Sequence, residues 1–268
     1  MGVQSGRFQG YEAMKVSLFI PCFVDQLLPQ VGIDLATVLR RIGCDVNFPE
    51  AQTCCGQPAF NTGYWGEAKP LAERFVSVFR SADFVVCPSG SCTAMVRNFY
   101  PELLADSPLR EEAMDIGSRV FEFSEFLVTF AKAGEVAARF PHRVAVHDSC
   151  HALRELHLKQ QPREVLRHVQ GLTLVDLPYS EDCCGFGGTF SGKFPMISAA
   201  MGDAKAASAE RSAAEYVTST DPSCLLHIEG IFRRHNSQVR IISLPGILAQ
   251  TASAGEHAAD ARPSRSAP

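Results

Sequence analysis

The sequence predicts an α/β protein of two homologous lobes from a tandem duplication, each a small, mostly parallel sheet flanked by helices. Short apolar runs alternate with amphipathic stretches, which is typical of parallel sheets covered by helices. An apolar run that ends in cysteine occurs twice, as Val16–Cys22 and again as Val144–Cys150. The triplet Cys54-Cys55-Gly56 recurs as Cys183-Cys184-Gly185, at nearly the same offset along the chain.

Two further landmarks keep the same order in both halves of the chain. Phe84–Ser89 resembles Tyr216–Ser223 at a similar offset, and Cys92 and Cys224 close the two units. Four matched landmarks in one order indicate a duplication, and the period is far longer than that of solenoid repeats.

The domain boundaries follow from this repeat and from composition. We expect one lobe at 14–135 and the other at 140–252. The ends, 1–13 and 253–268, show no hydrophobic periodicity, so we expect a disordered leader and a disordered tail.

The first lobe is expected to begin with a strand at 15–20, where apolar residues run together. A helix at 26–42 follows, because its apolar residues recur at helical spacing, and Gly43 suits the end of that helix. The remaining elements expected in this lobe are strand 46–48, helix 66–81, strand 84–86, helix 91–99, strand 119–121 and helix 124–133.

The second lobe is expected to repeat this alternation. Its predicted elements are strand 143–147, helix 162–170, strand 173–176, helix 194–213, strand 215–219, helix 223–233, strand 240–242 and helix 245–251. Ligands of parallel sheets gather at the carboxyl ends of the strands, and Cys22, Cys87, Cys150 and Asp221 each follow a predicted strand. We therefore expect these side chains at one edge of each sheet.

Composition excludes several classes of function. The 268 residues carry a net charge of −4, which gives no general attraction to nucleic acid or anionic lipid. No apolar run approaches the ~18 residues that cross a membrane, and residues 1–14 lack the apolar core of a secretory signal. We expect a cytoplasmic protein with reduced cysteines.

Nine of the ten cysteines belong to the repeated pattern. Cys44 lies outside it, in an apolar corner, and we expect it to be a buried structural thiol. The candidate ligands are Cys22, Cys54, Cys55, Cys87 and Cys92 in the first lobe and Cys150, Cys183, Cys184 and Cys224 in the second.

Adjacent cysteines followed by glycine favour a metal centre over buried thiols. Neighbouring side chains of a strand point to opposite faces, whereas a loop can turn both thiolates towards one multinuclear centre. Glycine allows the close backbone approach that such a loop needs. Soft thiolates select zinc, copper(I) or iron–sulfur clusters, and the first lobe offers five thiols where zinc needs four ligands.

The Cys…Cys-Cys-Gly…Cys pattern, present twice, resembles the CCG (cysteine-rich) domain of iron–sulfur proteins. That domain occurs in the B subunit of heterodisulfide reductase and in iron–sulfur subunits of the glycolate oxidase type. With two such units and no ferredoxin-type segment, residues 14–252 are most similar to the lactate utilisation A family. Its members are iron–sulfur subunits of a three-protein system that oxidises L-lactate.

The resemblance implies an iron–sulfur cofactor of the 4Fe–4S type, which is non-cubane and held by five cysteines in the reductase. In the first lobe the five-thiol set is complete, although four residues separate Cys87 from Cys92 where the reductase motif has two. In the second lobe Asp221 stands in place of the fifth cysteine. Because a carboxylate is a harder ligand than a thiolate, that lobe is expected to hold a four-thiol cluster, a zinc ion or a labile cluster.

Three histidines accompany the second set of cysteines. His151 and His147 flank Cys150 in sequence, and His227 lies one helical turn after Cys224. Each can tune a cluster by hydrogen bonding, and His151 and His227 are candidate additional ligands together with Asp221. The alternative is that they are ordinary core or surface histidines.

The resemblance implies an electron-transfer subunit of an oxidoreductase complex that converts L-lactate to pyruvate. Its partners would be the other subunits of a lactate-oxidation complex, which are iron–sulfur and accessory proteins, with no nucleic acid and no membrane span. Two alternatives stay open: a zinc-binding structural or assembly protein, and a metal-free thiol–disulfide oxidoreductase.

Overall fold

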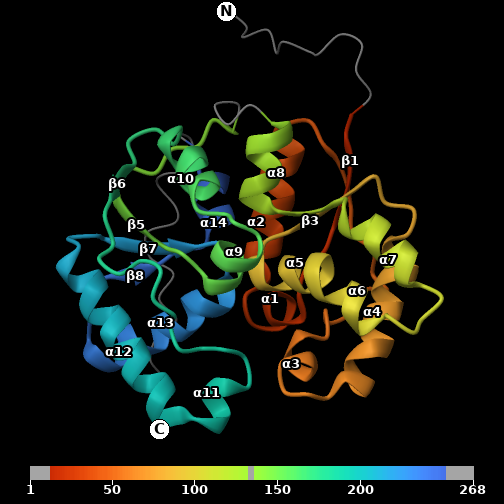
Figure 1. The fold of residues 1–268 in the computed structure, drawn as a ribbon. Helices are drawn as coiled ribbons and strands as arrows, with labels where there is room; N and C mark the ends of the chain where they lie inside the picture. Colours follow the sequence, from red (N-terminus) through yellow and green to blue (C-terminus); the bar gives the residue numbers. More distant parts are fainter. Residues whose placement is uncertain (1–12, 132–135, 252–268) are drawn as a thin grey trace, which may run out of the picture.

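The computed structural model describes residues 13–131 and 136–251 (Figure 1). The leader up to residue 12 and the tail expected at 253–268 lie outside these ranges. Within them the chain forms two four-stranded sheets, and every strand pairing is parallel. The strand orders, β2-β1-β3-β4 and β6-β5-β7-β8, are the same in both halves. The expected fold, two homologous α/β lobes, is confirmed.

The first lobe alternates strands and helices in the expected order. Its elements are β1 (Lys15–Leu18), α1 (Cys22–Leu27), α2 (Pro29–Arg41), β2 (Asp45–Asn47), α3 (Gln57–Phe60), α4 (Trp65–Phe79), β3 (Phe84–Cys87), α5 (Gly90–Ala94), the π-helical turn η1 (Met95–Phe99), α6 (Tyr100–Leu103), α7 (Arg110–Gly117), β4 (Val120–Glu122) and α8 (Phe123–Phe130). The single helix expected at 26–42 is two helices, because the backbone leaves helical geometry at Leu28 and Pro29 starts a new helix.

The second lobe repeats this order with fewer short helices. Its elements are β5 (Arg143–His147), α9 (Cys150–Glu155), α10 (Gln160–Arg167), β6 (Thr173–Val175), α11 (Phe190–Lys193), α12 (Pro195–Arg211), β7 (Tyr216–Ser219), α13 (Pro222–His235), β8 (Arg240–Ile241) and α14 (Leu244–Ala249). Among the described helices, none combines the length and the hydropathy needed to cross a membrane.

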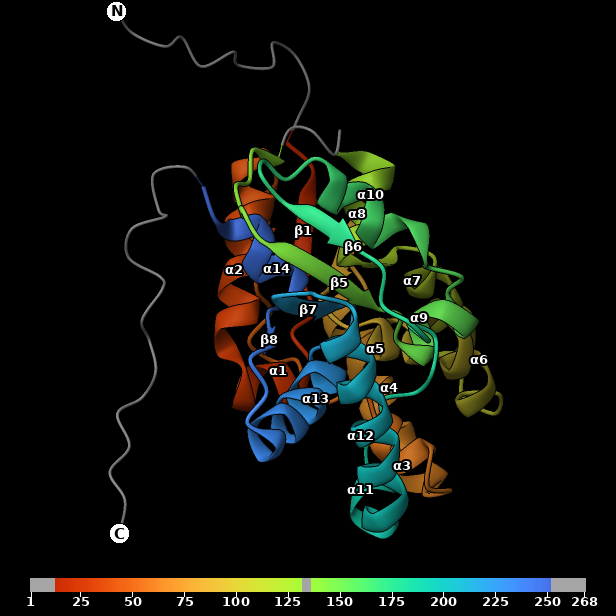
Figure 2. The ribbon, with the colours of Figure 1, turned by 90° about the vertical axis from the view of Figure 1, so that its left-hand side faces the viewer.

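Three hydrophobic cores cover the two sheets. One core lies between the lobes and contains residues from both: Val16 and Leu18 of β1 meet Val144 and Val146 of β5 within the same cluster. The outer face of each sheet has a core of its own, built around α4 in the first lobe and around α12 and α13 in the second. Figure 2 shows the first lobe behind the sheet of the second lobe.

The helices between the lobes pack in equivalent pairs. Helix α14, the last of the second lobe, packs on α2, and α8, the last of the first lobe, packs on α10 (Figure 1). By their positions relative to β1 and β5, α2 corresponds to α10, and α8 corresponds to α14. The contacts of α5 with α9 and of α13 with α1 form a second such pair. The two lobes are therefore related by an approximate twofold axis.

Close approach at this axis requires glycine at position 90. A Cβ added to Gly90 would lie 2.7 Å from Cβ of Ala152, on the facing helix α9. The Gly90 amide also donates to the carbonyl of Thr220 at 3.1 Å, so the backbones of the two lobes are directly joined.

Arg41, at the end of α2, ties the first lobe to the last helix of the second. Its guanidinium donates to the carbonyls of Val136, Leu248 and Ala249 at 3.1, 2.8 and 2.6 Å. The last carbonyls of a helix have no hydrogen-bond partner within the helix. A cation placed there donates to them and interacts favourably with the negative end of the helix dipole.

Replacing Arg41 with methionine is expected to lower the free energy of unfolding by about 2 kcal/mol, because charged hydrogen bonds to otherwise unpaired carbonyls are lost. Chemical denaturation of the full chain measures this. Arg40→Met on the exposed side of the same helix is the control, expected to stay within about 0.5 kcal/mol of the wild type. Equal effects from the two variants would show that the contact contributes nothing specific.

Candidate metal centre

Cysteines from both lobes line one cavity of about 410 Å³ at the carboxyl ends of the strands. Eight of the nine candidate cysteines contribute to its wall: Cys22, Cys54, Cys55, Cys92, Cys150, Cys183, Cys184 and Cys224. All ten cysteines of the chain lie in the described ranges, and all are free thiols. Each lobe thus supplies four thiols to the cavity.

In the first lobe the four thiols form a continuous set. Cys22 begins α1 directly after β1, Cys54 and Cys55 lie in the loop before α3, and Cys92 lies in α5. The sulfur atoms of Cys55 and Cys92 are 3.4 Å apart, and Cys54 is hydrogen bonded to both Cys22 and Cys55.

The second lobe reproduces this set from equivalent elements. Cys150 begins α9 after β5, Cys183 and Cys184 lie in the loop before α11, and Cys224 lies in the first turn of α13. Cys183 is hydrogen bonded to Cys150 and to Cys184, and Cys184 is hydrogen bonded to Cys224.

The first cysteine of each adjacent pair is the more acidic one. Hydrogen bonds from Cys22 and Cys55 lower the pKa of Cys54 to about 3, and the pKa of Cys183 falls to about 2 for the equivalent reason. The donating thiols, Cys22 and Cys150, have raised pKa values. Hydrogen bonding within each set thus favours ionisation of one cysteine, and thiolates are the metal-binding form of cysteine.

The glycine after each cysteine pair is required by backbone geometry. Gly56 and Gly185 have φ of +83° and +93°, a region that disfavours side chains. Their amides donate to the sulfur atoms of Cys54 and Cys183, both at 3.4 Å. A Cβ on Gly185 would lie 2.6 Å from the carbonyl oxygen of Ser198. The left-handed turn is thus what brings an N–H donor to the thiolate.

Cys87 does not line the cavity. It ends β3, is fully buried in the outer core of the first lobe, and its thiol contacts the carbonyl of Ser89 at 3.5 Å. Of the five thiols expected as ligands in this lobe, four line the cavity and Cys87 does not.

Strand register also changes the residue that corresponds to Cys87. Val16 pairs with Phe84, and its counterpart Val144 pairs with Tyr216, so Phe84 of β3 corresponds to Tyr216 of β7. In this register Cys87 corresponds to Ser219, whereas Asp221 corresponds to Ser89. Asp221 is therefore the counterpart of Ser89 and not of Cys87, while it keeps the two-residue spacing to Cys224 that the reductase motif has. The shared Pro-Ser letters had shifted that alignment by two positions.

Ser89 and Asp221 face each other across the approximate twofold axis. Asp221, which is 2% exposed, accepts hydrogen bonds from the Ser89 hydroxyl at 3.0 Å and from the Ser91 amide at 2.7 Å. Hydroxyls of Ser91 and Ser223 add bonds at 3.1 and 3.2 Å. Burial raises the pKa of Asp221, and these donors oppose that rise. The carboxylate of Asp221 thus links the two lobes, and Asp221 also lines the cavity.

The three histidines singled out from the sequence lie in different surroundings. His151 lines the cavity with Nδ1 3.5 Å from the sulfur of Cys150. His227 lies outside the cavity lining and contacts the Ser198 hydroxyl at 3.5 Å. His147 is 1% exposed, and its ring nitrogen forms a compact group with the sulfur atoms of Cys184 and Cys224, with all ligand atoms within 4.8 Å of one another.

Cys44 lies apart from the cavity, as expected. It is buried in the core between the lobes, where burial raises its pKa to about 11. It is therefore a structural thiol.

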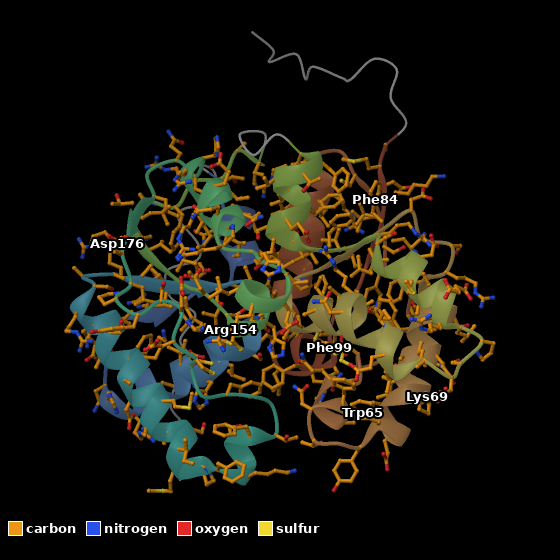
Figure 3. The ribbon with its side chains drawn as sticks, in the orientation of Figure 1. Trp65, Lys69, Phe84, Phe99, Arg154 and Asp176 are labelled. Carbon is orange, nitrogen blue, oxygen red and sulfur yellow. The ribbon has the colours of Figure 1, made fainter. Side chains whose placement is uncertain are left out.

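A second cavity, of about 540 Å³, reaches Cys183 from another side. Its wall includes the cations of Arg154, Lys205 and Arg211, with Asp182 as its acidic residue. Arg154 belongs to α9 in the second lobe and is labelled in Figure 3. Sequence patterns did not indicate this cavity, because α9 and α12 contribute to it from distant positions in the chain.

A model of the cysteine-rich (CCG) domain matches the chain twice, at residues 16–97 and 144–229. Three curated relatives are similar over 88% of the chain. "Lactate utilization protein A 2" of Bacillus cereus (strain AH820) is 39% identical over 98% of its own length. "Lactate utilization protein A" of Oceanobacillus iheyensis is 42% identical over 96% of its length, and that of Bacillus velezensis is 43% identical over 99%.

Replacing Gly185 with alanine is expected to lower the free energy of unfolding by about 2–4 kcal/mol, because strain at positive φ adds to a backbone clash. Denaturant unfolding measures this, and metal binding after reconstitution is expected to fall with it. Gly188→Ala is the control, since Gly188 has φ of +61° and open space around the added Cβ. A smaller loss in Gly185→Ala than in the control would contradict the clash.

Replacing Asp221 with alanine is expected to destabilise the chain by about 2 kcal/mol, because the buried hydroxyl of Ser89 and the amide of Ser91 lose their acceptor. Asp83→Ala, on the exposed surface, is the control and is expected to change stability by under about 0.5 kcal/mol. Thermal and chemical unfolding measure both variants. If Asp221→Ala were as stable as the wild type, the contact between the lobes would not depend on this carboxylate.

Proposed function

The chain belongs to the lactate utilization protein A family of cysteine-rich (CCG) domain proteins, and from this premise we propose that it is an iron–sulfur electron-transfer subunit. The reaction that it serves is the oxidation of L-lactate to pyruvate. The relatives named above are lactate utilization proteins, and their similarity along nearly their whole length supports this assignment.

The observation that carries the proposal is the convergence of eight reduced thiols on one cavity. Four thiols in each lobe, one of them with a pKa lowered by its neighbours, match the donor set that soft metals require. Buried structural thiols alone do not account for two equivalent sets that open into the same space.

The proposed ligands are the four cavity thiols of each lobe. A 4Fe–4S type centre bound there supplies one-electron redox chemistry. The chain holds the thiolates in place: Gly56 and Gly185 donate to them from the backbone, and Asp221 joins the two thiol sets across the axis. Cys87 and Cys44 are outside the proposed ligand sets.

The shared cavity supports a role in passing electrons between partners. Both thiol sets open into it, and Cys22 at its edge is exposed. We place the protein in the cytoplasm, where ten free thiols would stay reduced, with the other subunits of a lactate-oxidation complex as its partners.

The second cavity supports a small carboxylate as substrate. Arg154 and Arg211 supply cations to its wall, Lys205 is buried there with its ammonium bonded to the carbonyl of Tyr179, and Cys183 links the cavity to the thiol set of the second lobe. A lactate carboxylate suits such a wall, since cations bind carboxylates through charge-assisted hydrogen bonds.

One observation favours a second candidate, zinc, in the second lobe. The group of His147, Cys184 and Cys224 mixes nitrogen and sulfur donors, which is a common zinc ligand set. Zinc is colourless and redox-silent, so metal analysis separates the two candidates.

Chain reconstituted anaerobically with iron and sulfide is expected to bind both elements and to give an EPR signal on reduction. Mixed with its partner subunits, it is expected to be reduced when L-lactate is added. The Cys54→Ala variant is expected to lose the centre of the first lobe, because a cavity thiolate is removed, and the matched variant Cys44→Ala is expected to keep both centres. Failure of the wild-type chain to bind iron under these conditions would overturn the iron–sulfur proposal.

A further inference from the structure

His147 occupies a position at which the two lobes differ. It ends β5, and in the repeat that relates Val144 to Val16 its counterpart is Phe19, directly after β1. Phe19 is fully buried and packs edge-on against Phe75 and Phe79, with ring centroids 4.9 and 5.8 Å apart. The first lobe therefore fills this position with an apolar ring, whereas the second lobe buries a polar one.

Nε2 of His147 has no hydrogen-bond partner among the described residues, although it is fully buried. Leaving a buried polar atom unpaired costs about 1–3 kcal/mol, which is a large penalty for a position where phenylalanine also fits the fold. This unpaired nitrogen is an observation independent of the cysteine pattern.

The other ring nitrogen fixes which atom is available. Nδ1 of His147 lies 3.2 Å from the carbonyl oxygen of Ser180, and a carbonyl can only accept, so Nδ1 carries the proton. In the neutral ring Nε2 then has a free lone pair. A histidine that donates from one nitrogen to a backbone carbonyl and binds metal with the other is a common arrangement.

The polar groups around the ring have other partners. The carbonyl oxygen of Ser180 also accepts from Nζ of Lys205 at 3.4 Å. The nearby carboxylate of Asp148 is engaged elsewhere, in two bonds of 2.6 and 2.9 Å to Arg163.

The imidazole ring lies beside two thiols of the second lobe. Nitrogen and the sulfur atoms of Cys184 and Cys224 all lie within 4.8 Å of one another, and all three residues are buried. Ligand atoms of a tetrahedral site with bonds of about 2.0–2.3 Å lie roughly 3.3–3.8 Å apart, so this group would have to close in by up to about 1.5 Å to share one ion.

We propose that the metal centre of the second lobe takes Nε2 of His147 as a ligand beside the thiolates of Cys184 and Cys224, whereas the centre of the first lobe is bound by thiolates alone. This inference rests on the metal binding in the proposed function. It makes the two centres chemically different: nitrogen ligation lowers the negative charge at one of them.

The full-length chain is loaded anaerobically with iron and sulfide in one sample and with Zn²⁺ in another. Ligand nitrogen is detected as hyperfine coupling in pulsed EPR of the iron sample and by X-ray absorption at the zinc edge. One histidine nitrogen is expected in whichever sample fills the second lobe. In His147→Phe, which copies the first lobe, that nitrogen is expected to be lost, with affinity weaker by about tenfold or more.

His227→Phe is the matched control, because this histidine is in the same lobe but does not belong to the group of His147, Cys184 and Cys224, and it is expected to keep the nitrogen signal. Should His147→Phe fail to fold, the spectra of His147→Gln and of the wild type still test whether His147 supplies the ligand nitrogen. Metal bound by sulfur alone in the wild type, or a nitrogen signal that persists in His147→Phe or His147→Gln, overturns the inference and leaves the proposed function standing. A wild-type chain that binds neither metal overturns both.

Discussion

The core shared by the two lobes is the constraint on which the rest of the structure depends. Each sheet covers its outer face with its own helices, but its inner face is buried together with that of the other sheet. Burial of apolar surface is the main stabilising contribution in folding. A single lobe without the other would expose its part of this core to water. The shared core also sets the relative position of the strand ends, and that is why two separate thiol sets open into one cavity.

Much of the fold could be predicted because the apolar residues of its strands and helices recur at regular spacing in the sequence. The repeated apolar strands and the cysteine triplets indicated the duplication and parallel sheets, and they identified the thiols that line the cavity. Short helices were not predicted: α9 has six residues and α3 has four. Propensity summed over so few residues is a weak signal.

The correspondence of Asp221 could not be derived from letters alone. A shared Pro-Ser pair suggested one alignment, while hydrogen bonding between strands sets another, two positions away. The pattern likewise gave no reason to rank His147 first among three histidines. Its importance comes from an unpaired nitrogen and from neighbours that the fold brings in from other segments. Such contacts are non-local, so spacing in the sequence does not report them.

The approximate twofold axis has a consequence for how the chain arose. Paired contacts of equivalent helices, α2 with α14 and α10 with α8, are what a symmetric homodimer of a single lobe would make. In such a dimer the residues facing each other at the axis would be identical: two serines, or two buried carboxylates that repel each other. The pairing of Ser89 with Asp221 is not open to a symmetric homodimer, whereas the halves of a fused chain can change independently. Fusion of the two lobes thus lets equivalent positions at the axis carry different residues.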